Sequence, residues 1–351
     1  MSWLSDIARA EIRSLKPYEY AGWEPGLVRL HANELPWRSP VDATVAGLNR
    51  YPEPHPLALS GRLGALYGVP GECVLAGRGS DEAIDLLTRV YCRAGHDAVV
   101  ITPPTFGMYS VTARIQGAEV ITVPLRRDAG YAFDPAALRA ALTPAVKLVY
   151  LCSPNNPTGN SMDRGELLAL ARELEGRALL VVDEAYVEFS TQATLATELA
   201  ALPGLVVLRT LSKAHGLAGA RCGALLASAE IVALLRRVIQ PYAVSQLTIE
   251  AVFAALEPAP LAVSRERIAT LLAERTRLAA ALARTAGVTR VWPSDANFLL
   301  VEFTDPAAAL ARTHGAGLLV RDQRAVPTLG AALRISIGTR EHNDRLLEAL
   351  A

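Results

Sequence analysis

The chain has 351 residues and is 51% hydrophobic, so it is long enough to bury a large core and to form more than one domain. Lysine plus arginine equal aspartate plus glutamate at 35 each, and this balance excludes a global basic surface of the kind that holds nucleic acid or an anionic membrane. The four cysteines are widely spaced and form no CxxC pair, and no long apolar run follows the mixed N-terminal residues. We therefore expect a cytoplasmic protein with reduced thiols, no metal, no nucleic-acid partner and no membrane partner.

Residues 36–56 contain several prolines, and we expect this segment to be extended and irregular. Beyond them, short apolar runs rich in β-branched residues predict buried strands. The predicted strands are residues 74–76, 98–101, 119–123, 146–151, 179–182, 205–208 and 224–227. Segments with helical periodicity lie between several of them, such as residues 81–93 and 164–174. This alternation predicts an α/β domain with a mostly parallel, seven-stranded sheet covered by helices.

After Pro241 the pattern changes to long helices rich in alanine, leucine and arginine. Strand-like runs follow at residues 297–303 and 333–337, and the chain closes on a helix. These elements predict a second, smaller α+β domain. We place the large domain at residues 41–245 and the small domain at 246–351.

Three of the predicted strands are followed by polar residues of a distinctive kind. Asn156 lies in an Asn-Pro-Thr-Gly turn after the fourth strand, Asp183 follows the fifth, and Ser212-Lys213 follows the sixth. Taken singly, each has an ordinary interpretation as a turn residue, a helix cap or a surface lysine. The carboxyl ends of parallel strands, however, meet at the edge where open α/β sheets bind ligands.

The lysine motif has the composition expected of a reactive amine. Small residues and glycines surround Lys213, where a solvated helix face would carry other charges. A lysine that forms an imine needs a partly desolvated site, so that its neutral amine is accessible. A carboxylate such as Asp183 is what a pyridine nitrogen requires in order to stay protonated.

With these motifs in this order, the sequence resembles the fold-type I pyridoxal-phosphate-dependent aminotransferases, and within them the histidinol-phosphate aminotransferase branch. The motifs that carry the resemblance extend over nearly the whole chain: they lie at residues 30–36, 51–54, 77–82, 103–109, 152–160, 183–186, 211–221 and 333–338. Near the expected substrate entrance, the sequence differs from the residues common in this family at Leu35, Trp37 and Arg38. The resemblance implies a homodimer, and an N-terminal arm at residues 1–40 that packs on the small domain.

The resemblance also implies a set of residues that bind pyridoxal 5'-phosphate. Lys213 forms the Schiff base and moves the proton, Asp183 pairs with the pyridine nitrogen, and Phe106 stacks on the ring. Asn156 and Tyr186 donate to the phenolic oxygen. The phosphate is held by Ser80, Asp81, Thr210, Ser212 and Arg221, with Tyr51 reaching from the partner subunit. Because Asp81 and Glu82 are acids beside a dianion, their side chains must point away or be offset by Arg221.

For substrates, the resemblance implies glutamate and 2-oxoglutarate in one half-reaction, and imidazole-acetol phosphate and histidinol phosphate in the other, in a ping-pong cycle of histidine biosynthesis. Arg334 and Arg321 bind the anionic groups, and Tyr18, Asn33 and Tyr109 line the entrance. An aromatic amino-acid aminotransferase and a phosphothreonine decarboxylase share the scaffold and remain alternatives. A catalytically idle binding protein would not need the whole set of reactive residues, and no GxGxxG motif supports a dinucleotide enzyme.

Overall fold

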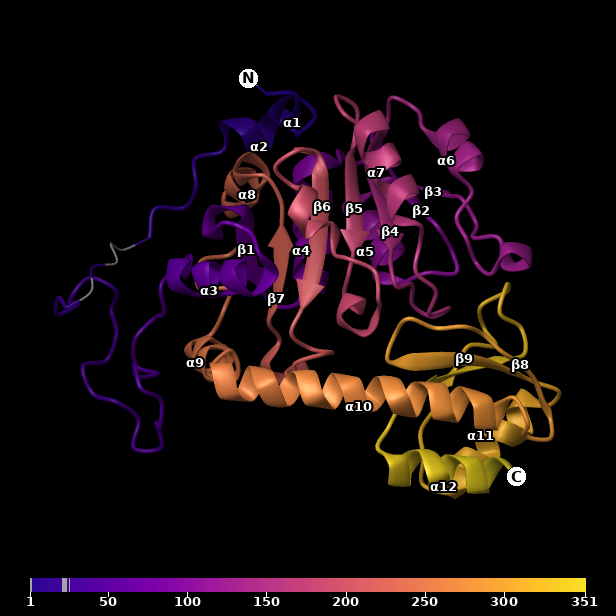
Figure 1. Cartoon of the computed structure of the whole chain (residues 1–351). Helices are drawn as coiled ribbons and strands as arrows, with labels where there is room; N and C mark the ends of the chain where they lie inside the picture. The colour runs from indigo at the N-terminus through magenta and orange to yellow at the C-terminus, as the bar shows by residue number, and fades with distance from the viewer. Residues whose placement is uncertain (1, 21–23, 25) are drawn as a thin grey trace.

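The computed structural model describes residues 2–20, 24 and 26–351. Its centre is a seven-stranded sheet in the order β1-β7-β6-β5-β4-β2-β3 (Figure 1). Only β7 is antiparallel to its neighbours. The strands are β1 (Val74–Gly77), β2 (Ala98–Ile101), β3 (Glu119–Thr122), β4 (Val146–Cys152), β5 (Leu179–Asp183), β6 (Leu205–Thr210) and β7 (Gly223–Leu226). The predicted strands and the mostly parallel α/β fold are therefore confirmed.

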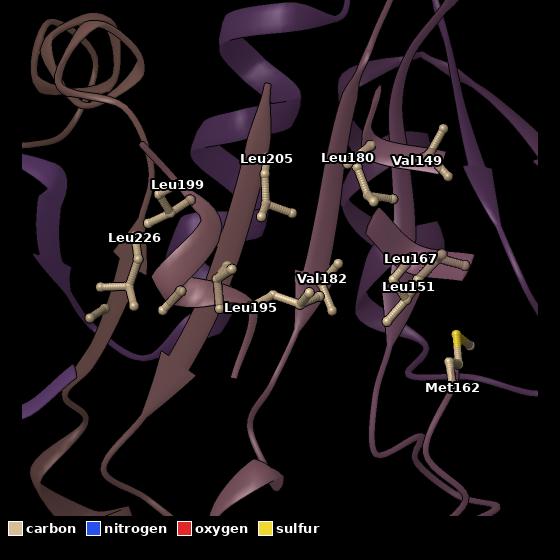
Figure 2. Close-up of a cluster of buried hydrophobic side chains, with 14 of the residues drawn as sticks. Val149, Leu151, Met162, Leu167, Leu180, Val182, Leu195, Leu199, Leu205 and Leu226 are labelled. Carbon is tan, nitrogen blue, oxygen red and sulfur yellow. The ribbon is translucent and has the colours of Figure 1, made fainter. Parts of the chain in front are cut away.

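The sheet is covered on both faces, because alternate side chains of its central strands enter two different apolar cores. In β4, Val149 and Leu151 belong to one core, and Leu148 and Tyr150 belong to the other. Figure 2 shows the first core, where Val182 of β5 lies close to Leu195. The helices of this domain are α3 (Leu57–Tyr67), α4 (Ser80–Tyr91), α5 (Met108–Gln116), α6 (Pro135–Ala141), α7 (Arg164–Glu173) and α8 (Ala229–Arg236). Short 3-10 helices lie at η1 (Gly71–Cys73), η2 (Arg127–Ala129), η3 (Val187–Phe189), η4 (Leu195–Glu198) and η5 (Ala218–Ala220).

The small domain is a four-stranded antiparallel sheet with helices, reached through the long helix α10 (Figure 1). Its strand order is β10-β11-β9-β8. Its elements are α9 (Gln246–Ala255), α10 (Pro258–Leu282), β8 (Val288–Val291), β9 (Phe298–Phe303), α11 (Pro306–Gly315), β10 (Arg321–Asp322), β11 (Ala332–Ser336) and α12 (Arg340–Leu350). Strands β8 and β10 are not predicted from the sequence, because both are short and carry charged residues.

Polar contacts fix the small domain against the large one. Arg127 Nη2 donates to both carboxylate oxygens of Glu302 at 2.8 Å. Arg275 Nη1 donates to the carbonyl oxygens of Phe189 and Ala296 at 3.1 and 2.9 Å. These bonds hold the small-domain sheet beside the carboxyl ends of the large-domain strands.

The N-terminal segment lies elsewhere than expected. Helix α1 (Trp3–Asp6) packs on the large domain, where Leu4 is 2% exposed, and is followed by α2 (Ala10–Ser14). Arg9 N donates to Val90 O of α4 at 3.0 Å. The expectation that residues 1–40 pack on the small domain is therefore wrong for this start of the chain, because its apolar side chains complete a large-domain core. From α2 to α3 the described residues form no helix or strand and loop out beside the large domain (Figure 1), and we call this stretch between the two helices the arm.

Over residues 2–20, 24 and 26–351, no single helix is long and apolar enough to cross a membrane. Helices α9 and α10 meet that test only when taken together, as a pair bent by 74°.

Candidate active site

A cavity opens at the carboxyl ends of β4, β5 and β6, where the sheet was expected to bind a ligand. Each of these three neighbouring strands ends in one of the polar motifs, so the motifs of Asn156, Asp183 and Lys213 lie together at this edge. With the exception of Tyr51, the predicted cofactor residues all line the cavity: they are Ser80, Asp81, Phe106, Asn156, Asp183, Tyr186, Thr210, Ser212, Lys213 and Arg221. The structure thus brings together residues that are up to 141 positions apart in the sequence, from Ser80 to Arg221.

Lys213 lies in the turn after β6, and its side chain is exposed to the cavity. The turn is held by Ser212 N, which donates to Thr210 Oγ1 at 3.1 Å. Lys213 Nζ lies 5.6 Å from the ring centre of Tyr186. Desolvation lowers the pKa of Lys213, and the positive charges of Arg334 and Arg221 lower it further. The neutral amine is therefore more accessible here than on a surface lysine.

Asp183 ends β5 and is 4% exposed. Its Oδ2 accepts a hydrogen bond from the Tyr109 hydroxyl at 2.7 Å, and its Oδ1 accepts one from Ala185 N at 3.0 Å. Burial raises the pKa of Asp183, whereas these two donors favour the ionised form. A buried carboxylate in this position is satisfied by a cationic donor, such as a protonated ring nitrogen.

The position of Tyr109 corrects an expectation. Its side chain is fully buried on the inner face of α5, with its ring stacked on Tyr150 at 4.9 Å between ring centres. It therefore supports Asp183 from behind and does not line the substrate entrance. The motif placed Tyr109 near the site, but the direction of the side chain depends on which face of α5 packs against the sheet.

Asn156 and Tyr186 present polar groups to the side of the cavity nearest the small domain. Asn156 Oδ1 accepts a hydrogen bond from Arg334 Nη1, which orients the amide of Asn156. Tyr186 is 8% exposed and its ring packs edge-on against Phe298 at 5.2 Å between centres. Burial raises the pKa of Tyr186, so its hydroxyl stays protonated and can donate. Phe106 also lines the cavity and offers an aromatic surface there.

The start of α4 forms an anion site. Gly79 precedes the helix with φ 86°, and no side chain caps the first backbone N–H groups. Added Cβ atoms at Gly79 and Gly223 would lie 2.8 Å from Arg221 Nη2 and Ser80 N respectively, so the two glycines permit this close approach. Free N–H groups, the positive end of the helix dipole and a guanidinium together suit a phosphate.

The two acids at this helix start are both neutralised. Asp81 Oδ2 lies 3.3 Å from Arg221 Nη2. The Glu82 carboxylate instead accepts from the backbone N–H of Arg78 at 2.7 Å and from Arg78 Nε at 2.9 Å. Both expected arrangements are thus present: the charge of Asp81 is offset by Arg221, and the carboxylate of Glu82 is turned toward Arg78.

Arg334 and Arg321 lie directly opposite each other on β11 and β10. They line a wider hollow that opens beside the cofactor cavity, together with Lys213, Gln323 and Met108. Arg334 is half-buried, and its Nε is buried without a hydrogen-bond partner. Two adjacent guanidinium groups with an unsatisfied donor favour an anionic ligand.

The other expected site residues lie on the arm, outside both hollows of this chain. Tyr51 is 50% exposed, and its ring stacks on Tyr242 at 4.6 Å between centres. Tyr18 is 71% exposed, and Asn33 has φ 56° in an irregular segment. The structure therefore does not bring Tyr51, Tyr18 and Asn33 to the site within one chain.

Several residues around the site are not predicted from the sequence. Cys152 and Ala218 line the cofactor cavity, and Gln323 and Val326 line the wider hollow. None of them carries a local signal. A buried charge pair, Glu184 and Arg209, also lies beside the strand ends. Its signal was available, because an arginine within an apolar strand implies a buried partner. Across the described residues, no three His, Cys, Asp or Glu side chains gather as metal ligands.

Comparisons with known proteins agree with this geometry. Residues 38–350 match the profile of the family described as aminotransferase class I and II. The histidinol-phosphate aminotransferase of Stenotrophomonas maltophilia (strain R551-3) is 53% identical over 333 residues, covering 93% of this chain and 90% of that protein.

Two solved structures extend the comparison. The histidinol-phosphate aminotransferase from Sinorhizobium meliloti in complex with pyridoxal-5'-phosphate has a TM-score of 0.78 at 27% identity, covering 86% of this chain and 82% of that one. The L-threonine-O-3-phosphate decarboxylase from Porphyromonas gingivalis has a TM-score of 0.73 at 25% identity, covering 86% and 90%. The fold is thus shared by enzymes with two different reactions, and the higher sequence identity is with an aminotransferase.

Proposed function

This chain belongs to the class I and II aminotransferases, a pyridoxal-phosphate-dependent family, and we propose that it moves an amino group from glutamate to imidazole-acetol phosphate, which gives histidinol phosphate. The observation that carries the proposal is the convergence of Lys213, Asp183 and Arg221 on one cavity, in a chain 53% identical to a histidinol-phosphate aminotransferase. Histidinol phosphate and 2-oxoglutarate are then the products of the biosynthetic direction, with imidazole-acetol phosphate as the amino acceptor.

Bound pyridoxal phosphate would supply an electron sink for the substrate's α-carbon. The start of α4 with Arg221 fits its phosphate, and Asp183 fits its ring nitrogen. Lys213, with its lowered pKa, provides an amine that can bond to the cofactor and carry a proton between atoms of the substrate. Asn156 and Tyr186 are donors suited to the phenolic oxygen.

Arg334 and Arg321 are proposed to bind the substrates' anionic groups. Glutamate carries two carboxylates and histidinol phosphate carries a phosphate, so both substrates need cationic partners. A guanidinium binds either group through two parallel hydrogen bonds. The unsatisfied Nε of Arg334 supports this assignment.

We further propose that the active unit is a homodimer, in which Tyr51, Tyr18 and Asn33 serve the partner subunit's site. The arm that carries these residues exposes several large apolar side chains, including Leu30 at 90% and Val41 at 89%. An exposed apolar surface of this kind is typical of a protein interface. The proposed location is the cytoplasm, where unpaired cysteines such as the four of this chain are stable.

The test is an activity comparison with purified protein and pyridoxal phosphate. Glutamate is the donor, and imidazole-acetol phosphate is compared with phenylpyruvate as acceptor. We expect transfer to the phosphorylated acceptor to have the higher kcat/KM. Faster transfer to phenylpyruvate would instead indicate an aromatic aminotransferase, and release of CO₂ from phosphothreonine would indicate a decarboxylase.

A further inference from the structure

Three charged side chains contact one another beside the strands that form the cofactor cavity: Glu184 and Arg209 are buried, and Glu188 is partly buried, with 15% of its side chain exposed. We call them the buried charge cluster. The side chain of Arg209 is 7% exposed and that of Glu184 is 3% exposed. Arg209 Nη1 lies 3.4 Å from Glu184 Oε2, and Arg209 Nη2 donates to Glu188 Oε1 at 2.7 Å. The proposed reaction uses none of these groups.

The cluster is adjacent in sequence to residues that the reaction does use. Glu184 directly follows Asp183, and Arg209 directly precedes Thr210. Because consecutive residues of a strand point to opposite faces, Arg209 and Thr210 face away from each other. The two strand ends are also joined through the backbone, where Glu184 N donates to Leu208 O at 3.0 Å. A shift of either charged residue would therefore be transmitted to its cavity-facing neighbour.

The cluster also ties down the segments that surround it. Glu184 Oε1 accepts from Leu195 N at 2.7 Å, and Glu184 Oε2 accepts from the Thr194 hydroxyl at 2.5 Å. The guanidinium carbon of Arg209 lies 4.5 Å from the ring centre of Tyr67 on α3. One buried arginine thus connects the ends of β5 and β6 with η3, η4 and α3.

His215 extends the cluster to the lysine turn, since it lies two residues after Lys213. Its Nδ1 is buried without a hydrogen-bond partner, as is Oε2 of Glu188. Burial lowers the pKa of His215, while the carboxylate of Glu188 acts in the opposite direction, so the two side chains are electrostatic neighbours. Neutral imidazole offers one donor and one acceptor, and Glu188 Oε2 has free lone pairs that can accept from it through one water.

Stability alone does not account for this arrangement. Desolvating three charges costs several kcal/mol per ion, and apolar residues of similar volume are often at least as stable in such places. What charged groups add is direction, because their hydrogen bonds fix distances and angles that apolar packing leaves adjustable. Asp183 ends β5 and Lys213 lies in the turn after β6, so the cluster adjoins the segments that carry both.

We propose that the buried charge cluster and His215 are positioning residues that set the placement of Lys213 relative to Asp183. The inference rests on the proposed cofactor-dependent function, and none of these four side chains lines the cofactor cavity or the wider hollow. Displacement of a reacting group by about 1 Å costs on the order of 100-fold in rate, so a fixed strand end has a direct catalytic benefit.

The test compares Arg209→Met, which keeps length and loses the charge, with Arg209→Lys, which keeps the charge and loses the second contact. Glu274→Gln is the matched control. Glu274 is also a carboxylate with low exposure (8%), and it accepts hydrogen bonds from Arg277 Nε at 2.9 Å and from Asn343 Nδ2 at 2.9 Å. It lies in the small domain, away from the buried charge cluster. Three quantities are measured for each: the Kd for pyridoxal phosphate, the pH midpoint of the bound cofactor's absorbance change, and Tm.

Arg209→Met is expected to weaken cofactor binding by about 10-fold to 100-fold and to move the pH midpoint, with partial rescue in Arg209→Lys. The control is expected to lower Tm alone. If Arg209→Met lowers Tm but leaves the Kd and the midpoint unchanged, the role is structural and the inference is wrong.

If Arg209→Met does not fold, Glu188→Gln and His215→Asn are milder variants for the same measurements, with the same two outcomes. The wild-type protein separates the two hypotheses. A wild-type protein without any cofactor absorbance would overturn the proposed function itself, whereas a normal wild-type spectrum that the variants share would overturn only the role of the cluster.

Discussion

The two walls of the active site differ in how completely the fold satisfies their polar groups. On the large-domain wall, Asp183 is 4% exposed and both of its carboxylate oxygens accept hydrogen bonds. On the small-domain wall, Arg321 is exposed and Arg334 has a buried nitrogen without a partner. The carboxylate of Asp183 is thus held on both oxygens by the protein itself, whereas the unpaired Nε of Arg334 has hydrogen-bonding capacity that a ligand would fill. This difference fits a permanent cofactor on one side and exchanging substrates on the other.

The largest effect is expected on the large-domain wall, from Lys213→Ala. Loss of proton transfer alone should lower kcat by about 10²-fold to 10⁴-fold, and loss of the covalent bond should abolish the cofactor's shifted absorbance. The fold should survive, because the surroundings of Lys213 disfavour its charged form and removing the amine relieves that cost. Turnover assays, absorbance spectra and Tm measure these three effects. Wild-type activity in this variant would contradict the site assignment.

The second-largest effect is expected on the small-domain wall, where Arg334→Lys should weaken substrate binding. An ammonium keeps the charge but loses the two-pronged contact, which should cost about 2–5 kcal/mol in binding either anion. We expect both half-reactions to weaken, with glutamate and with histidinol phosphate, while the cofactor stays bound. Single-turnover spectroscopy of each half-reaction measures this. If only one substrate is affected, Arg334 does not serve both.

The arm is tested by Tyr51→Phe, which removes one hydroxyl from the proposed contact with the partner subunit's cofactor phosphate. Loss of a hydrogen bond to a charged group should weaken cofactor binding by about 10-fold to 100-fold. Mixing this variant with Lys213→Ala should restore activity, because one site of each hybrid dimer then holds both wild-type residues. Subunit exchange is verified by mass spectrometry. Exchanged chains that show no recovery would count against a shared site.

The smallest effect is expected from Tyr109→Phe, behind the large-domain wall. Without its hydroxyl, Asp183 loses a donor to its ionised form, so its pKa should rise further and its hold on the cofactor should weaken by about tenfold. The KM for histidinol phosphate should stay close to the wild-type value, since Tyr109 is fully buried. A raised KM with unchanged cofactor affinity would instead support the expectation that Tyr109 lines the substrate entrance. Fluorescence titration with pyridoxal phosphate and steady-state kinetics distinguish the two results.

The elements of the large domain and the cluster of polar residues at its strand ends are predictable from local patterns in the chain. Short apolar runs predicted each strand from β1 to β7. Apart from the partly exposed β3, these strands are buried on both faces and therefore need apolar residues at nearly every position. Asn156, Asp183 and Lys213 were predictable as neighbours, because parallel strands place their carboxyl ends at the same edge.

The directions and partners of individual side chains, in contrast, depend on how the elements pack together. Tyr109 is in the expected motif, yet the packing of α5 turns it toward Asp183. Arg334 and Arg321 are opposite each other because β10 pairs with β11, and β10 is too short to leave a periodic signal. Helix α1 packs on the large domain because an incomplete apolar core lies there. The local sequence pattern indicates whether a segment forms a helix or a strand. The direction of a side chain, the register of a strand and the partner of each depend on contacts between segments far apart in the chain.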